Sequence, residues 1–206
     1  MNRDDLIERA SLFVDKGRSR AMGRVHLFLG QNYRMTELQG AVARAQLEKG
    51  VRLIEARRKA ADALSARVRH IAGIVVPEVS VGTRPSWWLY NWVIEEAKLG
   101  VSADDFCDAL SVEGVPAGRQ YLPRPLFEED VIAKRNTFGR SGYPFSAVDY
   151  TLPTRADFPG LEEFFRRQII LSWNSRLSSK DIDDTAHAVG KVLAATTRVS
   201  RLSNEF

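Results

Sequence analysis

GQNYRMTELQ, residues 30–39, runs from a loop into the longest helical pattern of the chain. Thr36 stands where a helix N-cap is expected, and Gln39, three residues later, is placed to complete a capping box. Asn32 and Arg34 lie just ahead of the cap, beside unpaired backbone donors and the positive end of the helix dipole. Such a place favours an anion. The pattern predicts an anion-facing loop; the alternative is that both side chains are ordinary solvated loop residues.

The helix that follows is predicted over residues 37–70. At about 1.5 Å per residue it would be about 50 Å long, which exceeds what a small domain needs. We therefore expect it to link two bodies or to pack against a partner subunit. Gly50 in its interior costs about 1 kcal/mol relative to alanine. Apolar residues at helical spacing form a stripe along it: Leu38, Ala41, Val42, Ala45, Leu47, Val51, Ile54, Ala61, Leu64 and Val68.

The remaining patterns predict the fold class α/β, with the long linking helix followed by a small mixed α/β domain. An amphipathic helix is expected at 4–16 and an Arg- and Gly-rich loop at 18–30. Beyond residue 71, strand and helix patterns alternate. Strands are expected at 74–77, 87–94, 115–122 and 169–173, a loop-rich stretch at about 136–160, a short helix at 161–167 and a frayed end at 197–206.

Two further helix starts carry capping signals. Ser102 is followed by Asp105 and Ser178 by Asp181, each at the spacing at which an N-cap and the third helical residue bond each other. Gly114 is a natural end for the first of these helices. Local chemistry thus predicts both helix starts and one helix end.

Composition narrows the classes of function. The 206 residues are 44% hydrophobic and 27% charged, an ordinary globular balance. The net charge is +4, but basic and acidic residues are interspersed and no aromatic-basic motif is present, so we expect no nucleic-acid partner. No apolar run is long enough to span a membrane, and the charged N-terminus lacks a signal core. The expected location is therefore cytoplasmic, with no membrane association.

The titratable residues suggest no metal or thiol chemistry. Cys107 is the single cysteine, which fits a reducing compartment, and it is interpreted as a core residue rather than a nucleophile. His26, His70 and His187 are widely spaced without a cysteine nearby, so no metal site is expected.

Several motifs together resemble one enzyme family. They are HLFLGQNYRMTELQ at 26–39, AQLEK at 45–49, EGVPA at 113–117 ahead of Tyr121 and Pro125, and ILSWN at 170–174. The chain resembles the DegT/StrS-type aminotransferases, which are fold-type I enzymes that use pyridoxal phosphate (PLP) to transaminate ketosugars, often nucleotide-linked, or ketocyclitols. Only the C-terminal portion of such an enzyme is matched.

The resemblance implies a domain organisation. Residues 1–36 would be the end of the cofactor domain, a helix plus an active-site loop. Residues 37–70 would be the linking helix, 71–200 the small C-terminal α/β domain and 201–206 a tail. The complete enzyme would work as a homo-oligomer, or this chain would associate with a cofactor-bearing domain.

The resemblance also implies roles for individual residues. Asn32 would reach the PLP phosphate in the partner subunit's active site. Arg34, Tyr121 and Arg119 would lie on the substrate side, although the last two are equally well interpreted as small-domain surface.

No catalytic residue is expected in this chain. The family's Schiff-base lysine lies upstream of the segment that resembles residues 4–16, and none of the seven lysines here matches it. We therefore expect the chain alone to bind no PLP and to be inactive. The alternative is a non-catalytic dimerisation or interaction module related to these enzymes.

Overall fold

The computed structural model describes residues 3–19, 21–23, 25–137 and 139–203. The chain divides into two compact units, Met1–Val51 and Arg52–Phe206. The boundary between them falls inside the long helix α2, Glu37–Val68.

The first unit begins with α1, Asp4–Val14. This helix ends before residue 16 because Lys16 and Gly17 adopt positive φ angles of 64° and 69°, which turn the backbone out of the helix. The stretch expected to be a loop contains a small antiparallel pair of strands, β1 (Arg18–Ser19) and β2 (Val25–His26). Two-residue strands are too short to leave an alternating pattern in the sequence.

The first unit contains almost no buried apolar surface. Its buried described residues are Asp15, Gly17 and Ser19. The predicted apolar stripe of the long helix is solvent-exposed here, since four of its residues are 55% to 79% exposed: Leu38, Val42, Leu47 and Val51. The stripe is buried only in the second half of α2, at Ala61, Leu64 and Val68, where Ala60 and Ser65 are buried beside it.

The second unit is built on a four-stranded antiparallel sheet of order β3-β4-β6-β5. Its strands are β3 (Ile74–Val75), β4 (Tyr90–Ile94), β5 (Ala117–Gly118) and β6 (Gln168–Leu171). The helices are α3 (Glu96–Leu99), α4 (Ala103–Val112), α5 (Asp130–Ala133), α6 (Pro159–Arg167) and α7 (Ser179–Ser203). The 3-10 turns are η1 (Leu126–Glu128), η2 (Phe145–Ala147) and η3 (Arg155–Asp157).

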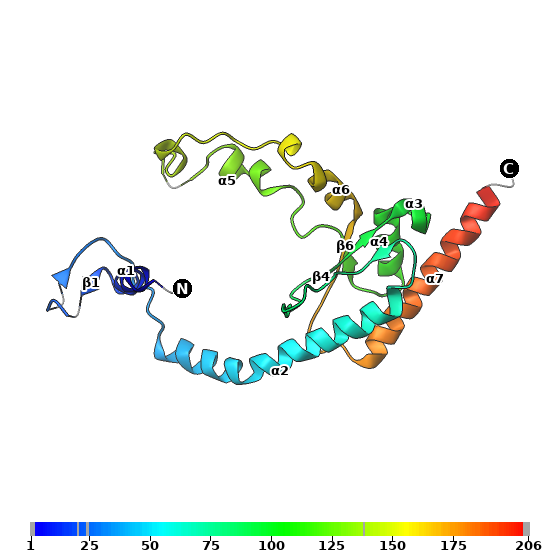
Figure 1. Ribbon diagram of the computed structural model, residues 1–206, viewed down its shortest axis with the longest axis horizontal. Helices are drawn as coiled ribbons and strands as arrows, with labels where there is room; N and C mark the ends of the chain where they lie inside the picture. Colours follow the sequence, from blue (N-terminus) through cyan, green and yellow to red (C-terminus); the bar gives the residue numbers. More distant parts are fainter. Residues whose placement is uncertain (1–2, 20, 24, 138, 204–206) are drawn as a thin grey trace. The chain divides into compact units, whose positions relative to one another are not determined.

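One face of the sheet carries the core of this unit. Along β4 every second residue is buried, and Tyr90, Trp92 and Ile94 are fully enclosed. Residues of α2, α4, α7 and β6 pack on that face: Leu64, Val68, Phe106, Leu110, Val189, Ile182, Ile169 and Leu171. Figure 1 shows β4 and β6 side by side with α4 close to them. The predicted α/β class is confirmed.

Several predicted elements differ in their limits. The strand expected at 87–94 begins at Tyr90, because Trp87 has a φ of 49° that no extended strand allows. The strand expected at 115–122 is reduced to β5. The helix expected at 161–167 begins at Pro159, which is favoured in the first turn of a helix.

The chain end also differs from its prediction. The last helix continues to Ser203, although the sequence suggested fraying from 197 and a tail at 201–206. Residues 204–206 lie outside the described residues.

The predicted capping interactions are confirmed. The Thr36 backbone N–H donates to Gln39 Oε1 at 2.9 Å, and the Gln39 N–H donates to Thr36 Oγ1 at 3.2 Å. Ser178 and Asp181 form the same reciprocal pair, at 2.7 Å and 3.2 Å. Ser102 Oγ accepts the N–H of Asp105 at 3.0 Å.

Within the part of the chain that the structure describes, no helix is both long enough and apolar enough to cross a membrane.

Candidate functional site

The loop that carries Asn32 is held against the end of α1 by backbone hydrogen bonds. The Lys16 N–H donates to the Gln31 carbonyl and the Tyr33 N–H to the Val14 carbonyl, both at 2.9 Å. These two bonds flank an isolated antiparallel bridge between Asp15 and Asn32. The loop is therefore positioned by the turn that ends α1.

Two glycines allow this close approach. A Cβ on Gly30 would lie 2.4 Å from the Gly17 nitrogen, and a Cβ on Gly17 would lie 2.0 Å from the Phe28 carbonyl oxygen. Both distances are shorter than any real Cβ contact, so only glycine fits. The sequence showed the two glycines but gave no sign that they meet.

The side chains of Asn32 and Arg34 lie together. Arg34 Nε donates to Asn32 Oδ1 at 2.9 Å and lies 3.3 Å from Asp15 Oδ1. A guanidinium carries donors only, so the amide oxygen of Asn32 must face Arg34. The amide NH₂ of Asn32 then remains as a donor directed elsewhere.

This arrangement fits a phosphate-type anion. Arg34 contacts Asn32 and Asp15 through Nε, and its side chain is 43% exposed. Asn32 adds its amide donor. The Asp15 carboxylate opposes an anion, but it is also paired with Arg18 at 3.3 Å, which offsets part of its charge. Asp15 was missed in the sequence analysis, because nothing in the local pattern places it beside residue 34.

Tyr121 and Arg119 lie in the second unit, where their side chains have different environments. The Tyr121 ring packs edge-to-face against Trp88, with centroids 5.1 Å apart and planes at 73°. Both residues are 60% exposed. The adjacent pair Trp87-Trp88 is visible in the sequence, but its contact with Tyr121 is not.

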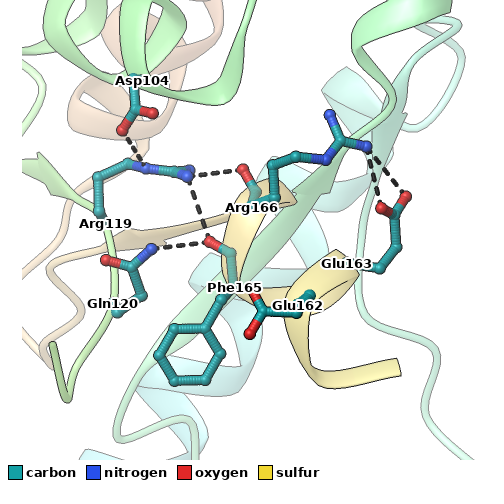
Figure 2. Close-up of a pocket in the computed structure, with 7 residues that line it drawn as sticks. All are labelled: Asp104, Arg119, Gln120, Glu162, Glu163, Phe165 and Arg166. Carbon is teal, nitrogen blue, oxygen red and sulfur yellow. Dashed lines mark hydrogen bonds and ion pairs between the residues drawn. The ribbon is translucent and has the colours of Figure 1, made fainter. Parts of the chain in front are cut away.

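The Arg119 guanidinium is engaged by other parts of the fold. Figure 2 shows its guanidinium between Asp104 and the end of α6. Its Nε lies 2.7 Å from Asp104 Oδ1. Its Nη2 donates to the Arg166 carbonyl at 2.6 Å and to the Phe165 carbonyl at 3.3 Å. Its Nη1 donates to the Gln168 carbonyl. Its neighbour Gln120 donates to the Phe165 carbonyl at 2.7 Å. The cavity beside these groups has a volume of about 370 Å³.

Cys107 belongs to the core, as predicted. It is 3% exposed on the inner face of α4, and burial raises the pKa of its thiol. Among the described residues, no group of three or more His, Cys, Asp or Glu side chains is arranged to hold a metal ion.

A family model, the DegT/DnrJ/EryC1/StrS aminotransferase family, matches residues 1–190. The chain belongs to the DegT/DnrJ/EryC1/StrS aminotransferase family. Enzymes of this family depend on PLP, and the predicted membership is confirmed.

A curated relative and two solved structures show how much of their length this chain matches. It is 24% identical over 168 residues to the spore coat polysaccharide biosynthesis protein SpsC of Bacillus subtilis, covering 80% of this chain and 38% of SpsC. The structure of Helicobacter pylori PseC, an aminotransferase involved in pseudoaminic acid biosynthesis, matches with a TM-score of 0.68 at 19% identity, over 95% of this chain and 48% of PseC. S. venezuelae DesV matches with a TM-score of 0.72 at 21% identity, over 94% of this chain and 45% of DesV. The chain thus spans about half the length of these solved structures or less.

Proposed function

We propose that this chain is the C-terminal portion of a PLP-dependent aminotransferase that acts on a ketosugar, often nucleotide-linked, or on a ketocyclitol. The observation that carries the proposal is the Asn32–Arg34 pair, fixed against the end of α1 with an amide and a guanidinium accessible to an anion. Family membership supplies the anion, since PLP carries a phosphate. Relatives that are named as sugar aminotransferases support the substrate class.

Each part of the chain then has a proposed role. Residues 1–36 would complete a cofactor domain, 37–70 would link it to the small domain and 71–200 would form that domain. Asn32 donates its amide N–H to the phosphate of PLP in a partner subunit. Arg34 holds the Asn32 amide in the required orientation and adds positive charge beside the phosphate or the substrate. Tyr121 contributes its exposed ring to the sugar side.

PLP, when bound, supplies the electron sink that lets an amino group move from glutamate or glutamine to the keto carbon. A lysine that holds PLP needs a lowered pKa, which burial or a neighbouring cation provides. Here six of the seven lysines are solvent-exposed and Lys16 is half-buried. This distribution supports the proposal that the chain alone binds no PLP and is inactive.

The test compares the isolated chain with its native assembly. The tagged chain is purified from its own cells together with any polypeptide that stays bound. Both samples are assayed for bound PLP and for amino transfer from glutamate to a nucleotide-linked ketosugar. We expect transfer and PLP in the assembly only, with no lysine of this chain trapped by borohydride. A trapped lysine in the isolated chain would contradict its proposed inactivity.

Asn32→Ala tests the phosphate role in that assembly. It should lower PLP retention roughly tenfold, the effect of one lost charge-assisted hydrogen bond. Gln46→Ala, an exposed amide on α2, is the matched control and should leave PLP retention unchanged. Equal PLP retention in Asn32→Ala, Gln46→Ala and the unsubstituted protein would show that Asn32 does not bind the cofactor.

A second candidate is a non-catalytic dimerisation or interaction module. It is favoured by the first unit, which buries no apolar side chain among its described residues yet exposes many, including Leu29 at 91% and Tyr33 at 68%. An apolar surface of this kind favours association. Sedimentation of the isolated chain decides: self-association supports the module, and a monomer at high concentration counts against it.

A further inference from the structure

The chain makes a long excursion between two neighbouring strands. β5 and β6 pair through Ala117↔Leu171 and Gly118↔Ile170, so the chain leaves the sheet after Gly118 and returns beside it at Gln168. We call the intervening residues 119–137 and 139–167 the arm. It carries α5, α6 and the three 3-10 turns, and is drawn from green to yellow in Figure 1.

The base of the arm is closed by Arg119 and Gln120. Their side chains leave one leg of the arm and donate to carbonyls at the end of the other leg, at Phe165, Arg166 and Gln168 (Figure 2). The last carbonyls of a helix have no partner within the helix, so these donors cap α6. Asp104, on α4, anchors the same guanidinium to the body of the unit.

Further along, the two legs are joined by weaker contacts. Arg155 Nη2 lies 2.8 Å from Glu128 Oε2, and the rings of Phe127 and Phe158 stack at 5.4 Å. The Arg155 side chain is 45% exposed, and exposed ion pairs contribute little to stability. Arg119 is only 18% exposed, and its guanidinium donates to the three carbonyls of Phe165, Arg166 and Gln168.

We propose that Arg119 is a positioning residue that fixes the base of the arm on the sheet and thereby holds the Tyr121 ring against Trp88. Tyr121 follows Gln120 directly, so its backbone starts from the anchored dipeptide. Trp88 directly follows Trp87, a residue that packs on the core. Trp87 has a left-handed backbone, and its ring packs edge-on against the buried Tyr90 with centroids 5.3 Å apart. The Trp88 side chain remains 60% exposed.

Two separate anchors therefore set the position of one exposed aromatic pair. The assignment of Tyr121 to the sugar side rests on the proposed function, whereas the position of its ring against Trp88 does not. In this proposal Arg119, which the sequence places on the substrate side, acts through its neighbour Tyr121.

Only a guanidinium suits this position. Its three nitrogens address a carboxylate on one side and three carbonyls on the other. A lysine ammonium keeps the charge but presents its donors from a single point, so it reaches only part of the set. Arg119→Lys is therefore expected to behave like Arg119→Met rather than like the unsubstituted protein.

The ring position can be read by NMR in the complete chain. The indole N–H resonance of Trp88 is assigned with Trp88→Phe, and Tyr121→Leu defines its shift without the neighbouring ring. In Arg119→Lys and Arg119→Met this resonance should move most of the way to the Tyr121→Leu value. Arg124→Met is the matched control, since Arg124 lies in the arm but pairs with Glu129 and Asp130, and it should leave the resonance in place.

Hydrogen exchange checks that the effect is local. Amides of α6 should exchange about tenfold faster in both Arg119 variants, while those of β4 keep their protection. The proposal is overturned if the Trp88 resonance stays in place in both variants, if lysine restores it, or if β4 loses protection together with α6. None of these measurements depends on PLP or on activity. The proposed function can therefore fail while the role of Arg119 stands, and the role of Arg119 can fail while the proposed function stands.

Discussion

Arg34 and Asn32 form a side-chain pair in which the guanidinium Nε donates to the amide Oδ1 at 2.9 Å. The pair sets which end of the amide is free, and it does so two residues before the helix cap at Thr36. The contact is between exposed groups, so its strength must be modest. The main effect of the pair is to orient the Asn32 amide.

A double-mutant cycle measures this coupling. Arg34→Ala and Asn32→Ala should each increase exchange of the Tyr33 amide, which bonds the Val14 carbonyl. The coupling between the two substitutions should be about 0.5–1 kcal/mol. Arg44→Ala, an exposed arginine 3.7 Å from Glu48, is the control and should leave Tyr33 unaffected. Additive effects of Arg34→Ala and Asn32→Ala would show that the pair is not coupled in solution.

Gly30→Ala and Gly50→Ala should have opposite effects. At Gly30 the new methyl would lie 2.4 Å from a backbone nitrogen, so the loop must leave the end of α1 and the Lys16 amide should lose protection. At Gly50, inside α2, nothing lies within 4 Å, and alanine should stabilise the helix by about 1 kcal/mol. Hydrogen exchange measures the Lys16 amide in Gly30→Ala, and far-ultraviolet circular dichroism measures helix stability in Gly50→Ala. Normal protection of Lys16 in Gly30→Ala would contradict the close approach.

The capping box of α2 gives a third prediction. Thr36→Ala should remove about 1 kcal/mol of stability from the first turn, because the Gln39 N–H loses its acceptor. Thr36→Ser retains the hydroxyl and should behave like the unsubstituted protein. Amide exchange at residues 37–40 is the measurement, and equal rates in the alanine and serine variants would argue against the cap.

The buried phenol of Tyr90 leads us to expect that the protein loses stability in alkali. Burial raises the pKa of its phenol, which bonds Ser65 inside the core. The folded state therefore holds the proton more tightly than the unfolded state. Stability is unaffected below the unfolded pKa of about 10, and it falls as the pH rises from there through the folded pKa.

Urea unfolding from about pH 8 to 11 tests this, across the ordinary tyrosine pKa. Tyr90→Phe should cost about 1–2 kcal/mol at neutral pH by leaving Ser65 without its partner. The alkaline decline should be shallower in that variant. Tyr143→Phe, whose ring is 63% exposed, should keep the full decline. Parallel curves for Tyr90→Phe and the unsubstituted protein would assign the decline to other groups.

The sequence was most informative where the interacting residues are close along the chain. The caps at Thr36, Ser102 and Ser178 were predicted correctly because each involves a partner three residues away. The limits of strands were predicted less well. The start of β4 depends on the unusual backbone of Trp87, for which β-propensity predicts the opposite.

The sequence was least informative about contacts between distant segments. Arg119 bonds carbonyls nearly fifty residues further along, so no local pattern distinguishes it from a ligand-binding arginine. The stripe on α2 has a helical period throughout, yet periodicity cannot say which part of the stripe meets a partner.

The two ends of the arm emerge from neighbouring strands of one sheet, and this has a consequence for how the protein can vary. Lengthening a loop whose ends already meet adds only a logarithmic closure entropy, roughly 0.6 kcal/mol for each doubling. Segments inserted or deleted between Leu126 and Phe158 would leave the register of β5 and β6 unchanged. The arm is therefore the place where a designer can graft a new recognition loop without redesigning the sheet.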